Sequence, residues 1–327
     1  MRILGIETTC DETAIAIVED GHTILTNLIA SQIDIHQAFG GVFPEIASRE
    51  HVSQLLPLID QALKNTSLTK DSIDAIAVAS SPGLMGSIIT GLTVAKTLCL
   101  AWNKPLYLIN HIHAHLISPM MGLSPEKFKN LFPALGIVVS GGHTFFAQVD
   151  SPASYTPICH SVDDAIGEAF DKVGTMLGQK YPGGPKVEKL AEMGDDTRFR
   201  FKAGHVKKLP LHFSFSGLKT NVFYTVEALK KEKELTAQDI CDLAACFQKT
   251  AFFDLIHKAK KLTSTQNFKS ICVGGGVSAN GYFYKHLTAA FKSQSLPVYF
   301  PEKSLTTDNG AMIAALAFFQ SEFCKKA

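Results

Sequence analysis

The sequence predicts an α/β protein with two lobes, and three observations support this. With 327 residues, of which 46% are hydrophobic, the chain is too long for one compact core and suits two lobes of roughly 150 residues each. Short apolar, β-prone runs alternate with longer segments of helical periodicity. Two hairpins with polar turns, at residues 2–18 and 134–149, each open one half of the chain, which indicates an internal duplication.

Composition argues against several classes of protein. The N-terminal apolar run is interrupted by Glu7, Asp11 and Glu12 before a signal-peptide core could form, so we expect no secretion. The most apolar helix, at residues 84–102, carries Lys96 and falls short of the ~20 uninterrupted apolar residues of a membrane span. The seven cysteines contain no CxxC pair and are expected to be reduced thiols in a cytoplasmic protein. A net charge of +1 gives no global attraction for a polyanion, so nucleic acid would have to be bound by a local patch.

The first half contains elements that would lead the chain to a ligand site. Residues 40–62 are typical of a glycine turn followed by a helix, and a buried strand is predicted at 73–79. A small-residue loop then opens the helix at 84–102, and a short strand at 106–109 ends just before His111. Because ligands in open α/β sheets bind at the carboxyl ends of strands, the segment after this last strand is a candidate site.

That segment, HIHAH, places His111 and His115 four residues apart at the expected start of a helix. This spacing puts both imidazoles on one helix face, close enough to bind one metal ion, although buried or surface histidines without a ligand also occur at this spacing. A catalytic metal usually needs a third, carboxylate ligand. Asp308, at the start of the C-terminal helix, is a candidate, and its alternative role is the N-cap of that helix. His113 lies two positions off the ligand face, so we expect it behind the ligands or in solvent.

The turn of the first hairpin is unusually acidic. Glu7, Asp11 and Glu12 place three carboxylates within six residues, and their mutual repulsion gives nothing to a purely structural turn. Threonine and aspartate also favour turns through local hydrogen bonds, which is the alternative interpretation. We favour a functional role.

The second hairpin turns at Ser140-Gly141-Gly142-His143, where two free N–H groups could hold a phosphate or carbonyl oxygen. A simple hairpin turn is an equal alternative. Residues 161–260 are predicted to be mostly helical, with the loop YPGGP between two helices that carry Asp171 and Glu188. These two acids are either solvated charges or part of a site. After the strand at 270–273, a glycine run allows close approach of a ligand, and Asn280 offers a donor and an acceptor.

One basic segment interleaves cations with aromatic rings. Residues 198–202, RFRFK, are followed by Lys207 and Lys208. Such a pattern can bind phosphates and stack on bases, whereas most charge runs are only solvated surface.

Nine motifs match one family, in order and along nearly the whole chain: GVFPEIASREHV, SPGLMGS, HIHAH, VVSGGHT, DDAIGEAFDKVG, YPGGP, FSFSGLKT, GGGVSAN and TDNGAMIA. The sequence resembles the tRNA N6-adenosine threonylcarbamoyltransferases, whose bacterial members are called TsaD. The resemblance implies an actin-like, sugar-kinase-like ATPase (ASKHA) fold with two ribonuclease H-like lobes around a cleft. The expected lobes are residues 1–130, completed by a C-terminal helix at 308–327, and residues 131–307, with a helical insertion at about 161–260.

The resemblance also implies a reaction and its site. A threonylcarbamoyl group would pass from L-threonylcarbamoyladenylate to the N6 amine of adenosine 37 in tRNAs that read ANN codons, which releases AMP. The family's Fe²⁺ or Zn²⁺ ligands fall on His111, His115 and Asp308, with Fe²⁺ the favoured ion. Its adenylate-binding positions fall on Val138, Val139, Ser140, Gly141, Gly142, Asp171, Gly184, Glu188 and Asn280. Asp11 or Glu12 is our candidate to orient or deprotonate the adenine amine.

The implied partners are tRNA, the smaller paralogue TsaB and the ATPase TsaE, with the adenylate supplied by TsaC. The helix within residues 45–62 is a candidate docking face. The chain departs from the common pattern at His113, where bacterial relatives often carry glutamate, which affects the surroundings of the metal, and at Ser81 and Thr306.

Other classes fit the residues less well. A zinc protease of the HExxH type needs glutamate directly after the first histidine, and Ile112 stands there. An ATPase or sugar kinase of the same fold would hold Mg²⁺ with oxygen ligands rather than imidazoles. A scaffold with a dead site is disfavoured because all three metal positions are intact.

Overall fold

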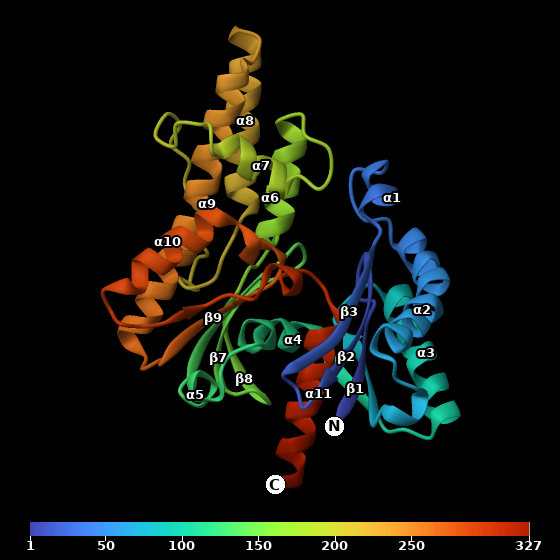
Figure 1. The fold of residues 1–327 in the computed structure, drawn as a ribbon. Coiled ribbons are helices and arrows are strands. Elements are labelled where there is room, and N and C mark those ends of the chain that lie inside the picture. The colour runs from blue at the N-terminus through green and yellow to red at the C-terminus, as the bar shows by residue number, and fades with distance from the viewer. Residues whose placement is uncertain (327) are drawn as a thin grey trace. The chain divides into compact units, whose positions relative to one another are not determined.

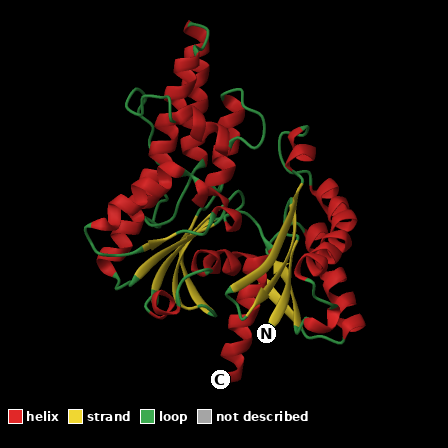
Figure 2. Ribbon diagram, in the orientation of Figure 1, coloured by secondary structure: helices red, strands yellow, loops and turns green. Residues whose placement is uncertain are grey.

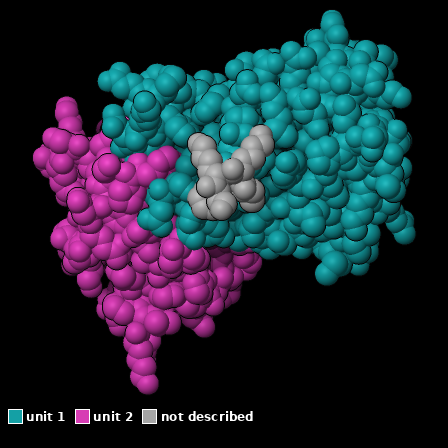
Figure 3. Space-filling view, turned by 90° about the horizontal axis from the view of Figure 1, so that it is seen from below, with its two compact units in different colours: residues 1–131, 149–155, 300–327 teal, residues 132–148, 156–299 magenta. Residues whose placement is uncertain are grey.

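The computed structural model describes residues 1–326, the last four of them by backbone alone, so the side chain of Cys324 lies outside the described part. The chain divides into two compact units (Figure 3). Unit 1 comprises Met1–Leu131, Val149–Tyr155 and Phe300–Ala327, and unit 2 comprises Phe132–Gln148 and Thr156–Tyr299. The six described cysteines are free thiols, four of them buried.

Unit 1 is built on a five-stranded sheet with the order β3-β2-β1-β4-β5. Its strands are β1 (Arg2–Glu7), β2 (Glu12–Glu19), β3 (Thr23–Ser31), β4 (Ala75–Ser81) and β5 (Leu106–Asn110). The predicted hairpin is confirmed, because β1 pairs with β2 in antiparallel fashion, while β1, β4 and β5 run parallel. The apolar strands β1 and β4 are buried along most of their length, as expected for strands covered on both faces.

Helices cover both faces of this sheet. The helices of unit 1 are α1 (Ile33–Gln37), α2 (Pro44–Thr66), α3 (Met85–Trp102), α4 (His111–Ile117), α5 (Pro125–Lys129) and α11 (Gly310–Lys326). Helices α2 and α3 lie on one face of the sheet and α11 on the other (Figure 1). The helix predicted within residues 40–62 is confirmed as α2, which begins at Pro44 and ends before Ser67, a residue in the left-handed conformation.

Helix α3 is the single helix within residues 1–326 that is long and apolar enough to cross a membrane, judged by length and composition only. Its Ile88 and Ala95 side chains are buried, and Ala95 packs with Leu55 of α2 and Ile76 of β4 in the core of unit 1. One face of α3 therefore packs in the core of unit 1.

The start of α11 lies directly against the sheet because two glycines face each other. A Cβ atom on Gly5 of β1 would lie 2.1 Å from the carbonyl oxygen of Gly310, and a Cβ on Gly310 would lie 2.5 Å from the backbone nitrogen of Ala16. Both distances are far below van der Waals contact, so this approach requires the absence of a side chain on both elements. The next turns of α11, residues 311–317, are completely buried.

Unit 2 repeats the strand order of unit 1. Its strands are β6 (Ala134–Val139), β7 (Thr144–Ser151), β8 (Ser154–His160), β9 (Ser270–Gly274) and β10 (Val298–Tyr299), in the order β10-β9-β6-β7-β8. In both sheets the first three strands are neighbours in sequence order and the fourth pairs in parallel with the first. This shared order supports the internal duplication predicted from the two hairpins.

The helices of unit 2 are α6 (Ile166–Met176), α7 (Gly184–Ala191), α8 (Ser216–Glu232), α9 (Ala237–Thr265) and α10 (Gly281–Lys292). Helices α6 to α9 form a bundle above the sheet of this unit (Figure 2). The expectation of mostly helical structure at residues 161–260 is confirmed by α6 to α9, and the longest irregular stretch lies between α7 and α8. At the start of this stretch Gly194 packs directly on the backbone of α9, where a Cβ would lie 2.1 Å from the Cys241 carbonyl oxygen.

The glycine contact between β1 and α11 can be tested by adding one methyl group. We expect Gly5→Ala to lower the free energy of unfolding by about 2 kcal/mol, because the new atom overlaps backbone that cannot move away easily. Urea denaturation followed by circular dichroism would measure this. Gly41→Ala is the matched control, since no atom lies within 4 Å of its Cβ position. Equal stability of both variants would contradict the packing described here.

Candidate metal centre and donor site

The two histidines of the HIHAH segment lie one turn apart on α4, at the carboxyl end of β5. Asn110 begins this helix, since its side-chain oxygen accepts a hydrogen bond from the His113 N–H at 3.0 Å. The rings of His111 and His115 lie 4.6 Å apart, centroid to centroid, and both side chains are buried. The predicted arrangement of both imidazoles on one helix face is therefore present.

Asp308 joins this pair from a distant part of the chain. Its Oδ1 atom lies 3.0 Å from His115 Nε2 and 3.6 Å from His111 Nε2, and one ligand atom from each of the three residues lies within 4.8 Å of the others. The alternative role of Asp308 as helix cap is taken by Asn309, whose Oδ1 accepts from the Met312 N–H at 2.9 Å. Asp308 is thus directed at the histidines rather than at its own helix.

Glu7, at the end of β1, holds His111 from behind. Its completely buried carboxylate accepts a hydrogen bond from His111 Nδ1 at 2.8 Å and another from the Thr9 N–H. Because Nδ1 faces Glu7, Nε2 is the nitrogen that faces Asp308, which is how carboxylates commonly orient metal-binding histidines. The sequence placed Glu7 only in an acidic turn, because its partner lies 104 residues away.

The charges of the cluster favour a cation. Burial alone lowers the pKa of His111, but the carboxylates of Glu7 and Asp308 outweigh this and raise it to about 9. Two imidazoles and one carboxylate form the donor set that suits borderline divalent metals such as iron and zinc. His111, His115 and Asp308 are therefore compatible with a metal site.

His113 stays outside this cluster. Its Nε2 donates to the carbonyl oxygen of Pro152 at 3.0 Å, and its ring lies 4.6 Å from that of Tyr155, centroid to centroid. Burial lowers its pKa to about 4, so the ring is neutral. A solvent position for His113, one of two that we expected, is wrong, because the turn at Pro152 covers the side chain.

The acidic turn after β1 is electrostatically connected to the cluster. Burial, together with the charges of Asp11 and Asp308, raises the pKa of Glu12 well above its usual range. The same effects raise the pKa of the Cys10 thiol. His51 of α2 secures the turn, because its Nε2 donates to the Cys10 carbonyl at 3.0 Å while its Nδ1 bonds to the Thr13 hydroxyl at 2.7 Å.

In unit 2, the turn from Ser140 to His143 lies at the carboxyl end of β6. The Ser140 N–H donates to the His143 carbonyl at 2.8 Å, and the His143 N–H donates back to the Ser140 hydroxyl at 3.0 Å. Within residues 1–326 the exposed Gly141 and Gly142 have N–H groups without a protein acceptor. These two groups can receive a ligand oxygen, as the sequence predicted.

The glycine run after β9 meets the same strand end, because β6 and β9 are parallel. Gly275 has φ of +92° and lies so close to β6 that a Cβ would be 2.4 Å from the Val139 carbonyl oxygen. The start of α6 also packs there, since a Cβ on Gly167 would be 2.6 Å from the Ser140 carbonyl oxygen. Val138 and Val139 form the buried end of β6 beneath this corner.

The other predicted donor-binding residues of unit 2 hold loops in place. Asp171 Oδ1 accepts from the N–H groups of Gly183 and Gly184 at 2.8 and 2.9 Å, which fixes the YPGGP loop. Glu188 Oε1 accepts from the Gly281 N–H at 2.6 Å. Asn280 caps α10 through its oxygen and donates its amide to Gln248. The donor and acceptor atoms of Asn280, expected to be available, both have protein partners.

Solved structures with the same architecture show which fold the chain has. Full-length HypF in its phosphate- and nucleotide-bound form matches 99% of this chain and 46% of its own, with a TM-score of 0.63 and 14% identity. A ROK family protein from Streptococcus pneumoniae, solved with sucrose, matches over 100% of both chains, with a TM-score of 0.54 and 12% identity. At such identities only the fold is shared, and it is the predicted actin-like, sugar-kinase-like ATPase fold.

The family is defined by sequence. The TsaD model, described as tRNA N6-adenosine threonylcarbamoyltransferase, matches residues 23–315. The tRNA N6-adenosine threonylcarbamoyltransferase of Protochlamydia amoebophila (strain UWE25) is 46% identical over 329 residues, which cover 100% of this chain and 94% of its own. The chain belongs to this family of transferases, which act on tRNA and form N6-threonylcarbamoyladenosine at adenosine 37, as the motifs predicted.

The metal site can be tested by binding measurements without any enzymatic assay. We expect His115→Ala to abolish stoichiometric binding of Fe²⁺ or Zn²⁺, because it removes one of three ligands. Glu7→Gln keeps the shape of the side chain but removes its charge and should weaken binding about 10- to 100-fold. Elemental analysis and competition with a chelating dye would measure both. His205→Ala removes an exposed histidine of unit 2 and should bind like the wild type. Unchanged metal content in His115→Ala would rule out this site.

Proposed function

We propose that the chain transfers the threonylcarbamoyl group of L-threonylcarbamoyladenylate to the N6 amine of adenosine 37 in tRNAs that read ANN codons. The amine nitrogen forms a bond to the carbamoyl carbon, the bond from that carbon to the phosphate oxygen breaks, and AMP leaves with the electron pair. The observation that supports this best is the cluster of the buried His111 and His115 with the half-buried Asp308 in a chain of the transferase family. Because the donor is already activated, positioning contributes more than acid–base chemistry.

The donor is assigned to unit 2. The free N–H groups of Gly141 and Gly142 would stabilise the charge that develops on the attacked carbonyl, as oxyanion-hole donors do. Asp171 and Glu188 hold the backbone of Gly184 and Gly281, which gives the donor a rigid surrounding. The carboxylates of these two residues are the candidates to accept hydrogen bonds from the ribose hydroxyls of the adenylate.

The metal is assigned to unit 1, with Fe²⁺ as the proposed ion and Zn²⁺ as the alternative that the same donor set accepts. When bound by His111, His115 and Asp308, it would supply Lewis-acid stabilisation and a template for phosphate or carbamoyl oxygens. Glu7 keeps His111 in the tautomer that can bind it. Asp11 or Glu12 would orient the adenine amine and accept its proton.

The proposed reaction is tested by an assay with threonylcarbamoyladenylate, an ANN-decoding tRNA and the partner proteins. We expect transfer by the metal-loaded protein, loss of transfer after the metal is stripped, and recovery when Fe²⁺ is restored. Quantification of the modified nucleoside by mass spectrometry is the measurement. Full transfer by a sample without detectable metal would exclude the metal-dependent mechanism, and no transfer by the loaded protein would exclude the reaction itself.

The same assay tests the acidic turn. Asp11→Ala or Glu12→Ala should lower kcat about 100-fold if the missing carboxylate accepts the amine proton. Metal content measured on the same samples is the control, because these residues are not ligands in the proposed site. Wild-type rates in both variants would end this assignment.

We further propose a cytoplasmic protein that works with TsaB and TsaE, with the adenylate made by TsaC. Val52 and Leu56 on α2, and Met85 and Ile89 on α3, are each more than half exposed. Helices α2 and α3 pack together, and their N-terminal halves touch where Ser48 lies beside Gly86. An apolar face of two helices matches a partner that offers helices of its own, which supports this pair as the docking face for TsaB.

The docking face is tested by placing a charge within it. We expect Leu56→Glu to weaken binding of TsaB at least tenfold, because the charge would be desolvated in the complex. Isothermal titration calorimetry with purified TsaB would measure this. Leu108→Glu makes the same change at a similarly exposed position on β5 and serves as the control. Equal affinities of the two variants would place the interface elsewhere.

A further inference from the structure

A run of cations in unit 2 has no acidic partner. Residues 199–208 contain Arg200, Lys202, Lys207 and Lys208 and no aspartate or glutamate. All four side chains are exposed, and none forms an ion pair within the described part of the chain. Arg198, just before the run, differs because it is paired with both Asp239 and Asp242 of α9. The positive charge is therefore concentrated in one short segment.

This segment is anchored although it has no regular secondary structure. Arg198 Nη1 donates to Asp242 Oδ2 at 2.6 Å, and the Phe199 N–H donates to the Cys246 sulfur at 3.2 Å. Further along, a Cβ on Gly204 would lie 2.3 Å from the Ser214 carbonyl oxygen, so the backbone there is closely packed. Cations on a fixed backbone lose less conformational freedom on binding than cations on a loose loop.

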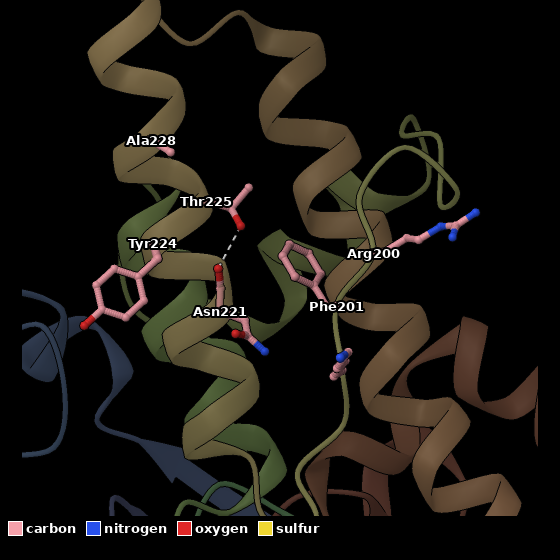
Figure 4. Close-up of a pocket in the computed structure, with 7 residues that line it drawn as sticks. Arg200, Phe201, Asn221, Tyr224, Thr225 and Ala228 are labelled. Atoms are coloured by element: carbon pink, nitrogen blue, oxygen red, sulfur yellow. Dashed lines mark hydrogen bonds between the residues drawn. The ribbon is translucent and has the colours of Figure 1, made fainter.

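A groove lies between this segment and α8 (Figure 4). It has a volume of about 490 Å³ and is lined by Arg200, Phe201 and Lys202 on one side and by Asn221, Tyr224, Thr225 and Ala228 of α8 on the other. In Figure 4, the Phe201 ring points toward Asn221 and Thr225, whereas Arg200 and Tyr224 extend outward. Tyr224 is 66% exposed, so its ring is accessible to a ligand.

Cations, aromatic rings and an amide around one groove suit RNA better than protein. Guanidinium and ammonium groups bind phosphates, and exposed rings stack on unpaired bases, which is the common mode of single-stranded RNA recognition. On the basis of the proposed function, we propose that the groove between residues 200–202 and α8 binds the tRNA, with Arg200 and Lys202 on phosphates and Tyr224 stacked on an unpaired base. An acidic protein segment is the competing occupant.

The test is tRNA binding by the full chain, measured by fluorescence anisotropy over a series of salt concentrations. The double variant R200A/K202A should bind about tenfold more weakly than the wild type and show a salt slope smaller by about 2, because each lost phosphate contact lowers the slope by about 1. The control K260A/K261A removes the same charge from exposed positions on α9 and should stay within about twofold of the wild type.

The aromatic contact is separated from charge by a second pair of variants. Tyr224→Leu should lower affinity at least about fivefold without changing the salt slope, because it removes stacking but no charge. Tyr224→Phe retains the ring and should bind like the wild type. If R200A/K202A and K260A/K261A lowered tRNA affinity equally, the groove assignment would be overturned. It would also be overturned if R200A/K202A bound tRNA normally but no longer bound a protein partner.

Transfer kinetics distinguish this inference from the proposed reaction. R200A/K202A should raise the KM for tRNA about tenfold and leave kcat and metal content unchanged, since neither residue is assigned to chemistry. If no form of the protein transfers the group but the double variant still loses tRNA affinity, the groove stands and the proposed reaction fails. If transfer proceeds normally in R200A/K202A with an unchanged KM, the reaction stands and the groove fails.

Discussion

The close approach of Gly5 and Gly310 is the constraint on which the metal centre depends. Gly310 begins α11, and Asp308 lies only two residues before it, so the depth at which the helix meets β1 sets the position of this carboxylate. A side chain on either glycine would push the start of the helix away from the sheet and so disturb the contact between Asp308 Oδ1 and His115 Nε2, which are 3.0 Å apart. The packing of the core and the position of the metal ligand therefore both depend on the absence of side chains at Gly5 and Gly310.

Strand β1 links these two features because it supplies both Gly5 and Glu7. Gly5 determines where α11 lies, and two residues later Glu7 fixes the ring of His111 through Nδ1. Residues two apart in a strand point to the same face, so the packing contact and the orienting carboxylate lie on the face that α11 covers. The Glu7 carboxylate is completely buried, so its hydrogen bond to His111 is stronger than it would be in water, and its negative charge favours a bound cation nearby.

Sequence reasoning succeeded where the determining interactions are local. The spacing of His111 and His115, the two hairpins and the start of α2 follow from neighbours within a few residues. The sequence did not reveal the interactions that depend on residues far apart in the chain. Glu7 meets His111 across 104 residues, and Asn309 rather than Asp308 caps α11 because the two adjacent residues are both good caps and only tertiary contacts choose between them. The amide of Asn280 is occupied by Gln248, 32 residues earlier, for the same reason.

The average charge of the chain conceals how its cations are distributed. Thirty-one basic and thirty acidic side chains nearly cancel, yet in unit 2 several acids are committed to nearby cations, among them Arg198, Lys219, Lys233 and Lys249. Those pairs neutralise one another within a few ångströms, and salt screens charges beyond about 8 to 10 Å. A phosphate at the surface is therefore attracted only by cations close to it, and residues 199–208 present four of these without an acid among them. A chain with almost no net charge can thus carry a strongly basic patch.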